Sequence, residues 1–168
     1  MPISSDQQWI CDQIEAYKQV QPRYQRMTAI IQKILEKACE KMAPQAIIQT
    51  RPKSIPSFAE KAQRKKNKYR DPLQRMTDLS GGRVITQSQD EVKAVCEFIE
   101  KNFLIDVENS VDVGQRLKPS EFGYRSVHYI VQFKRGVFPN DQVPVDVEDE
   151  FYPDLANPMK AEIQVRTV

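Results

Sequence analysis

Two carboxylates stand beside predicted strands, where they could bind a metal ion and act in catalysis. Asp78 precedes a strand predicted over residues 83–86, and Glu162 lies on a strand predicted over residues 161–167. Mg²⁺ takes few protein carboxylates and completes its octahedral shell with water and phosphate oxygens. The two residues are therefore candidate metal ligands. The open alternatives are that Asp78 is a turn residue bonded to its own backbone and that Glu162 belongs to a solvated sheet face.

Basic side chains form a second candidate group. Arg51 and Lys53 flank Pro52, and this proline and Pro56 place them on a loop or at a helix entrance rather than in a central strand. Arginine and lysine neutralise nucleotide phosphates during phosphoryl transfer. The basic run at residues 64–68 is interpreted instead as a solvated helix face.

A tyrosine and polar strand residues form a third group. Tyr124 follows a glycine at the mouth of a strand predicted over residues 126–134, on which His128 faces the polar side. An exposed tyrosine there could stack on a base, a contact that contributes about 1–3 kcal/mol. Gln164 shares the polar face of Glu162. The alternative for the tyrosine is an ordinary packing role.

Composition excludes several classes of protein. His128 is the single histidine, which removes zinc hydrolases, His-Asp phosphohydrolases and Cys₂His₂ fingers, since each needs at least two histidines. No P-loop or dinucleotide fingerprint is present. The net charge of +2 and three cysteines favour neither global nucleic-acid binding nor a disulfide framework. No apolar run approaches the roughly 20 residues of a membrane span and no secretory signal stands at the N-terminus, so we expect a cytoplasmic protein without a membrane partner.

Periodicity predicts an α/β (α+β) domain with a mixed sheet of about five strands. Apolar spacing indicates two helices over residues 6–19 and 22–42, with Pro22 opening the second. These form an N-terminal helical cap over residues 1–45, and the main domain covers residues 46–168. The remaining predicted strands lie at residues 46–49 and 104–107, and further helices lie at residues 57–67 and 89–102. Residues 138–158, rich in proline and acidic side chains, are interpreted as a loop or insertion.

Four motifs in register resemble the synthetase domain of RelA/SpoT proteins, and specifically the small stand-alone alarmone synthetases. The motifs are Arg51-x-Lys53-x-x-x-Ser57-x-x-x-Lys61, Asp78-Leu79-x-Gly81-x-Arg83, Gly123-Tyr124-Arg125-Ser126-x-His128 and Glu162-Ile163-Gln164-Val165-Arg166-Thr167. The resemblance covers about residues 46–167. It implies a nucleotidyltransferase-like fold and transfer of the β,γ-diphosphate of ATP to the 3′-hydroxyl of GDP or GTP, which makes the stringent-response alarmones ppGpp and pppGpp.

The resemblance also implies a role for each matched residue. Asp78 and Glu162 would bind Mg²⁺, and Glu162 would activate the attacking hydroxyl. The positions that match ATP-binding residues are Arg51, Lys53, Ser57, Lys61 and Arg83, with Arg51 as the candidate to lie on the adenine. The positions assigned to the acceptor nucleotide are Tyr124, His128, Gln164 and Lys118.

The sequence departs from the family pattern in three places. Gly82 replaces a more usual aliphatic residue in what we expect to be a turn, residues 138–158 are longer than the expected hairpin, and the sequence ends at Val168 without the family's C-terminal helix. With no hydrolase domain, the chain would make but not remove its product. The alternatives are synthesis of adenine alarmones, pyrophosphorylation of the tRNA 3′ end, with the basic helix carrying tRNA phosphates, and a catalytically silent nucleotide-binding module. We expect a homo-oligomer.

Overall fold

Within the described residues, five strands form one mixed sheet, and the strand that comes last in the sequence lies at its centre. They are β1 (Ile47–Pro52), β2 (Ser80–Thr86), β3 (Phe103–Ile105), β4 (Val127–Phe133) and β5 (Ala161–Thr167). Their order is β1-β2-β5-β4-β3, in which β2 and β5 are parallel and the other neighbours antiparallel. The computed structural model describes residues 2–110 and 126–168. The predicted five-stranded α+β fold is confirmed.

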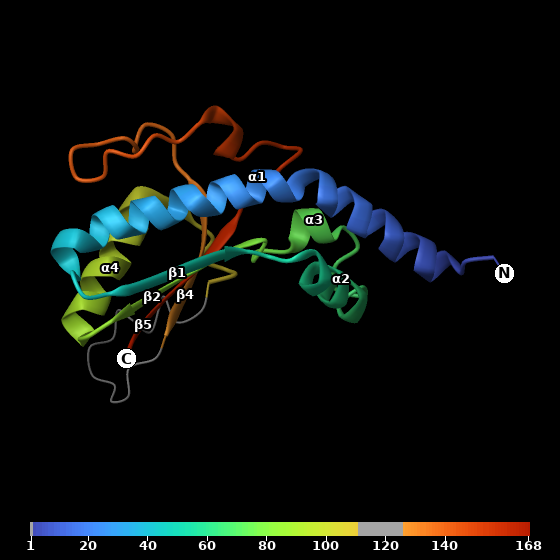
Figure 1. Ribbon diagram of the computed structural model, residues 1–168, viewed down its shortest axis with the longest axis horizontal. Helices are drawn as coiled ribbons and strands as arrows, with labels where there is room; N and C mark the ends of the chain where they lie inside the picture. The colour runs from blue at the N-terminus through green and yellow to red at the C-terminus, as the bar shows by residue number, and fades with distance from the viewer. Residues whose placement is uncertain (1, 111–125) are drawn as a thin grey trace.

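The helices in the described residues are α1 (Ser5–Met42), α2 (Ile55–Arg64), α3 (Pro72–Arg75) and α4 (Gln89–Asn102), with a 3-10 helix η1 (Asp149–Phe151). Two of them, α1 and α4, cover one side of the sheet. Helix α1 packs on β1 and β2, and α4 packs on β2, β3 and β5. Figure 1 shows α1 running along the molecule, with α2 and α3 beside its N-terminal half and α4 beside its C-terminal half. No helix in residues 2–110 and 126–168 is long and apolar enough to cross a membrane.

Helix α1 is continuous, so the prediction of two helices meeting at Pro22 is wrong. The proline lies inside a helix of 38 residues, where it removes a backbone hydrogen bond and costs about 3 kcal/mol. Buried side chains lie on both sides of it, including Tyr17, Tyr24 and Met27. Each fully buried apolar side chain contributes about 1.5–3 kcal/mol, so packing of both halves on one core offsets the local cost of the proline.

The two faces of the sheet differ in chemistry. Val84, Ile163 and Tyr129 are fully buried on the face under α1 and α4. Strand pairing arranges polar side chains in rows on the opposite face, because paired residues point the same way. One row crosses four strands and consists of Gln49, Arg83, Gln164 and His128. The neighbouring row contains Arg51, Gly81 and Glu162 and ends at the buried Ile130 of β4. This polar face brings together the predicted site residues that lie on strands, which are Arg51, Arg83, His128, Glu162 and Gln164.

Strand β1 extends further than the sequence suggests. Arg51 and Pro52 are its last two residues, so the expectation of a loop at Arg51 is wrong. The strand lies at the edge of the sheet, where the missing N–H of a proline removes no essential ladder bond. Lys53 then leaves the strand at the entrance of α2, as predicted, and its backbone N–H donates to the carbonyl of Leu79 at 2.9 Å.

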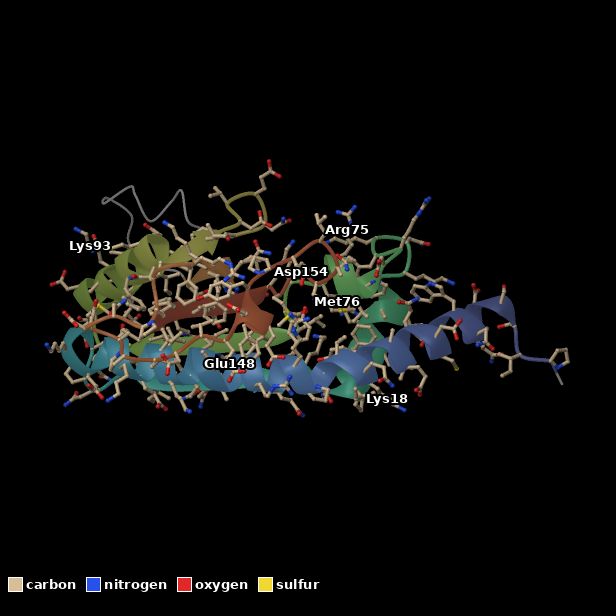
Figure 2. All side chains as sticks on the ribbon, turned by 90° about the horizontal axis from the view of Figure 1, so that it is seen from above. Lys18, Arg75, Met76, Lys93, Glu148 and Asp154 are labelled. Atoms are coloured by element: carbon tan, nitrogen blue, oxygen red, sulfur yellow. The ribbon has the colours of Figure 1, made fainter. Side chains whose placement is uncertain are left out.

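The segment over residues 138–158 contains no strand, as expected, but it packs closely on α1. The Arg23 guanidinium donates to the backbone carbonyl of Glu150, and Arg26 donates to both carboxylate oxygens of Glu150 at 3.2 Å. Phe151 is fully buried. Seen from above in Figure 2, the part of this segment that carries Glu148 lies over α1. The segment is therefore an integral layer of the fold.

Replacing Gly82 by alanine is expected to stabilise the protein by about 0.5–1 kcal/mol. Gly82 lies within strand β2 rather than in a turn, and a Cβ atom there would meet the side chains of Thr50 at 3.4 Å and Leu35 at 3.8 Å. These are ordinary contact distances, so the substitution reduces the freedom of the unfolded chain without a clash. Urea unfolding of both proteins measures the change. A less stable variant would show that the space between Gly82, Thr50 and Leu35 has no room for a methyl group.

Candidate active site

A cavity of about 430 Å³ opens on the polar face of the sheet, at the start of α2. The sequence-predicted residues that line it are Arg51, Lys53, Ser57, Asp78, Arg83, Glu162 and Gln164. The other lining residues are Gln49, Thr50, Pro52, Ser54, Gly81 and Gly82. The cavity thus gathers both candidate carboxylates and most of the candidate ATP-binding side chains.

Asp78 is held by two lysine side chains. Lys53 Nζ donates to Asp78 Oδ2 at 2.8 Å, and Lys61 Nζ donates to the same oxygen at 3.1 Å. Burial alone would raise the pKa of Asp78, but the hydrogen bonds and positive charges of Lys53 and Lys61 outweigh burial and lower the pKa below its ordinary value. Asp78 is therefore ionised at neutral pH and orients both ammonium groups.

The local sequence explains why the two lysines converge. Lys53 is fixed by its N–H bond to the Leu79 carbonyl, next to the aspartate. Helix α2 begins after Ser54, whose hydroxyl accepts from the Ser57 N–H at 3.2 Å. Residues four apart lie on the same helix face, so Lys61 follows Ser57 on the side of α2 that meets the cavity. The electropositive N-terminal end of α2 adds to the attraction for an anion.

Arginine side chains approach the cavity from the sheet. Arg83 Nε donates to Gln164 Oε1 at 3.1 Å. Arg51 pairs with Gly81, which in turn pairs with Glu162, so the missing side chain of the glycine leaves space between the guanidinium and the carboxylate. Both arginines are exposed and can form bidentate hydrogen bonds to phosphate oxygens.

Glu162 is oriented by His128. The two side chains meet at 3.1 Å between His128 Nδ1 and Glu162 Oε1, and Ser126 Oγ lies 3.1 Å from His128 Nε2. A neutral imidazole that donates from Nδ1 to the carboxylate accepts at Nε2 from the serine hydroxyl. Sequence reasoning assigned His128 to the acceptor pocket and missed this contact with the catalytic candidate.

The donor set of the cavity fits magnesium. Asp78 Oδ1 is buried and has no hydrogen-bond partner within the described residues, an arrangement that is costly unless a cation reaches it. In the same part of the chain no three His, Cys, Asp or Glu side chains gather into a metal cluster. A metal ion here would rely on Asp78 and Glu162 together with water and substrate oxygens, which is the coordination that Mg²⁺ favours.

Four predicted site residues are not among the described residues that line the cavity. Lys61 and His128 reach the cavity through their bonds to the two carboxylates. Lys118 and Tyr124, the other residues predicted for the acceptor, lie outside the described residues. Gln49 lines the cavity but was not predicted. Its signal is the two-residue spacing from Arg51, which places both on one face of β1.

Comparison with protein families gives a match over most of the chain. Residues 50–168 match the family described as "Region found in RelA / SpoT proteins". A search of curated proteins finds no significant match.

Comparison with solved structures gives matches over 92% of this chain. Small alarmone synthetase 1 from Bacillus subtilis superposes with a TM-score of 0.61 at 21% identity, over 92% of this chain and 72% of that chain. The same protein bound to its product pppGpp gives 0.60, and bound to AMPCPP gives 0.58, each at 21% identity over 92% of this chain and over 73% and 71% of those chains. A GTP pyrophosphokinase family protein from Streptococcus pneumoniae gives 0.61 at 22% identity, over 92% and 70%. The five-stranded sheet and its helices are therefore shared with these proteins.

Proposed function

The chain belongs to the RelA/SpoT family, and on that premise we propose that it transfers the β,γ-diphosphate of ATP to the 3′-hydroxyl of GDP or GTP. The observation that carries the proposal is one cavity in which two carboxylates, Asp78 and Glu162, face basic side chains from β1, β2 and the segment that leads into α2, with Lys61 of α2 bonded to Asp78. The structures of the Bacillus subtilis relative bound to pppGpp and to AMPCPP support a guanine nucleotide product and an adenine nucleotide donor.

The donor side of the proposed site is the basic part of the cavity. Lys53 and Lys61 are held together by Asp78, and Ser57 adds a hydroxyl on the same helix face. Arg51 and Arg83 approach from the sheet. Such a cluster neutralises the charge of a triphosphate and holds it in one orientation, which is most of what phosphoryl transfer requires from a protein. We assign Arg51 to the adenine, where a cation–π contact contributes about 0.5–2 kcal/mol.

Asp78 and Glu162 are proposed to hold Mg²⁺. When bound, the ion supplies charge neutralisation at the transferring phosphates. Asp78 would bind through Oδ1, since its other oxygen is already engaged by the lysines. Glu162 keeps its position through His128.

The proposed reaction is an in-line displacement at the β-phosphorus. The 3′-oxygen of the acceptor forms a bond to the β-phosphorus, the bond to the oxygen that bridges the α- and β-phosphates breaks, and AMP leaves with that electron pair. Glu162 accepts the proton of the 3′-hydroxyl. His128 holds the carboxylate in the orientation for this transfer, and we assign Gln164, Tyr124 and Lys118 to the acceptor nucleotide.

Product analysis tests the proposal. The protein is incubated with γ-³²P-ATP, Mg²⁺ and, in parallel, GDP, GTP, ADP or deacylated tRNA, beside Glu148→Gln, an exposed carboxylate variant outside the cavity lining. We expect labelled ppGpp or pppGpp from both proteins. Label on ADP or tRNA in place of the guanine nucleotide would assign another acceptor. No labelled product with any acceptor would contradict the proposed reaction.

A further inference from the structure

Helix α1 holds the backbone of Lys53 although it is distant along the chain. The Tyr17 hydroxyl donates to the Lys53 carbonyl at 2.6 Å, and Gln21 Nε2 donates to the same oxygen at 3.1 Å. Tyr17 and Gln21 are four residues apart and therefore lie on one face of α1. The backbone N–H of Lys53 is bonded to the Leu79 carbonyl, so both backbone polar groups of Lys53 are fixed.

Tyr17 also contacts the helix that carries the second lysine. Its ring stacks on the ring of Phe58, with centroids 4.3 Å apart and planes 22° apart, and both side chains are fully buried. Phe58 follows Ser57 in α2, and Lys61 lies on the same helix. A single side chain of α1 thus touches both segments that bring an ammonium group to Asp78.

We propose that Tyr17 and Gln21 are positioning residues for ATP binding. Both fix the Lys53 backbone, and the Tyr17 ring also packs on α2, so that Lys53 and Lys61 meet where the phosphates bind. The inference rests on the proposed function for the identity of the donor nucleotide. It adds a role for α1, which contributes no side chain to the cavity lining in the described residues.

The contact is suited to a constant positioning role. Burial, followed by the nearby Tyr24 and Asp78, raises the pKa of Tyr17 well above its ordinary value, so the phenol keeps its proton and donates at all working pH values. Lysine is a flexible side chain whose placement depends on its backbone. Displacement of a binding group by about 1 Å can cost about 10²-fold in rate. Fixing the Lys53 carbonyl therefore matters because it fixes the position of the Lys53 ammonium group in the site.

The test uses paired substitutions that remove the donors and keep the packing. Tyr17→Phe retains the ring that stacks on Phe58, and Gln21→Met keeps a side chain of similar length. The matched control is Tyr24→Phe, which removes a phenol hydroxyl from the same helix. The Tyr24 hydroxyl interacts with the Met159 backbone and not with Lys53. Dissociation constants for a non-hydrolysable ATP analogue with Mg²⁺ are measured, together with KM for ATP and for the acceptor.

We expect each of the two variants to weaken analogue binding about fivefold, which corresponds to about 1 kcal/mol, the usual size of one hydrogen bond. KM for ATP should rise, while KM for the acceptor stays within about twofold. Tyr24→Phe should leave analogue affinity unchanged. Unchanged affinity in both variants, an equal rise in both KM values, or the same loss in Tyr24→Phe would overturn the proposal.

Two features of the experiment separate a loss of positioning from a loss of folding and from a failure of the proposed reaction. Thermal unfolding is recorded for each variant, and if Tyr17→Phe does not fold, Gln21→Met, at a half-buried position, decides the question. Analogue binding does not require turnover. A wild-type protein that binds the analogue but forms no labelled product would contradict the proposed reaction, while the variant series would still support or overturn the positioning role.

Discussion

Replacing Asp78 by asparagine is expected to lower turnover by roughly 10³-fold or more, because one carboxylate serves two purposes. In the proposed site its Oδ1 is the metal ligand, and its Oδ2 accepts hydrogen bonds from Lys53 and Lys61 and holds them together. Asparagine keeps the size of the side chain but removes the charge that both functions need. Initial rates with saturating ATP and GDP measure the loss.

The control for this substitution is Asp146→Asn, an exposed aspartate in the segment over residues 138–158 that lies outside the cavity lining. Its turnover should equal that of the wild type. Turnover of Asp78→Asn within tenfold of the wild-type value would remove Asp78 from the catalytic site.

The same substitution should change how stability depends on pH. The pKa of Asp78 is lowered in the folded protein, so its ionised form stabilises the fold above the unfolded pKa of about 3.9, and this contribution is lost as pH falls through the lower folded value. The metal-free wild type should exceed Asp78→Asn by about 1–3 kcal/mol in free energy of unfolding near pH 7. The difference should shrink below about pH 4. A difference that stays constant down to about pH 3 would show that packing, and not charge, causes it.

Replacing Glu162 by glutamine is expected to lower kcat by about 10²–10⁴-fold, the usual contribution of a general base. Glutamine retains an oxygen that can accept from His128 Nδ1, so the orientation seen at 3.1 Å can persist while the proton acceptor is lost. Affinity for a non-hydrolysable ATP analogue in the absence of Mg²⁺ should change less than about threefold, because the basic side chains remain.

Glu148→Gln is the matched control for Glu162→Gln, since it makes the same chemical change at an exposed position outside the cavity lining. Equal kcat values for Glu162→Gln and this control would assign proton transfer to another group. A large loss of analogue affinity without Mg²⁺ would indicate that Glu162 acts mainly in the structure of the site.

The strands could be predicted from sequence because alternation of side chains is a local property. The pattern of Val127, Tyr129 and Val131 places one face of β4 in the core, and the structure buries all three. The continuity of α1 could not be predicted in the same way. Pro22 is typical of a helix start, and only the packing of both helical halves on one core, visible in three dimensions, decides against a break.

In the candidate site, too, contacts between distant segments could not be predicted from local sequence patterns. Charged residues such as Asp78 and Glu162 can be picked out from a sequence because a carboxylate beside a predicted strand is almost never fully buried unless it is paired. Tyr17 does not stand out, since it fits the apolar stripe of its helix, and its contact with the Lys53 carbonyl spans 36 residues. Such long-range contacts depend on how α1 crosses the sheet, which no local pattern encodes.

The central place of β5 has a consequence for synthesis of the protein. A chain emerging from the ribosome can form the β1–β2 and β3–β4 pairs early, but β2 and β4 are joined only by β5. Until residues 161–167 have emerged, both strands present unpaired edges, which are prone to aggregation. Pairing of β2 with β5 also closes a long loop and is intrinsically slow. Nascent chains should therefore depend on chaperones until this strand inserts, and catalytic competence should arise in one step with completion of the sheet.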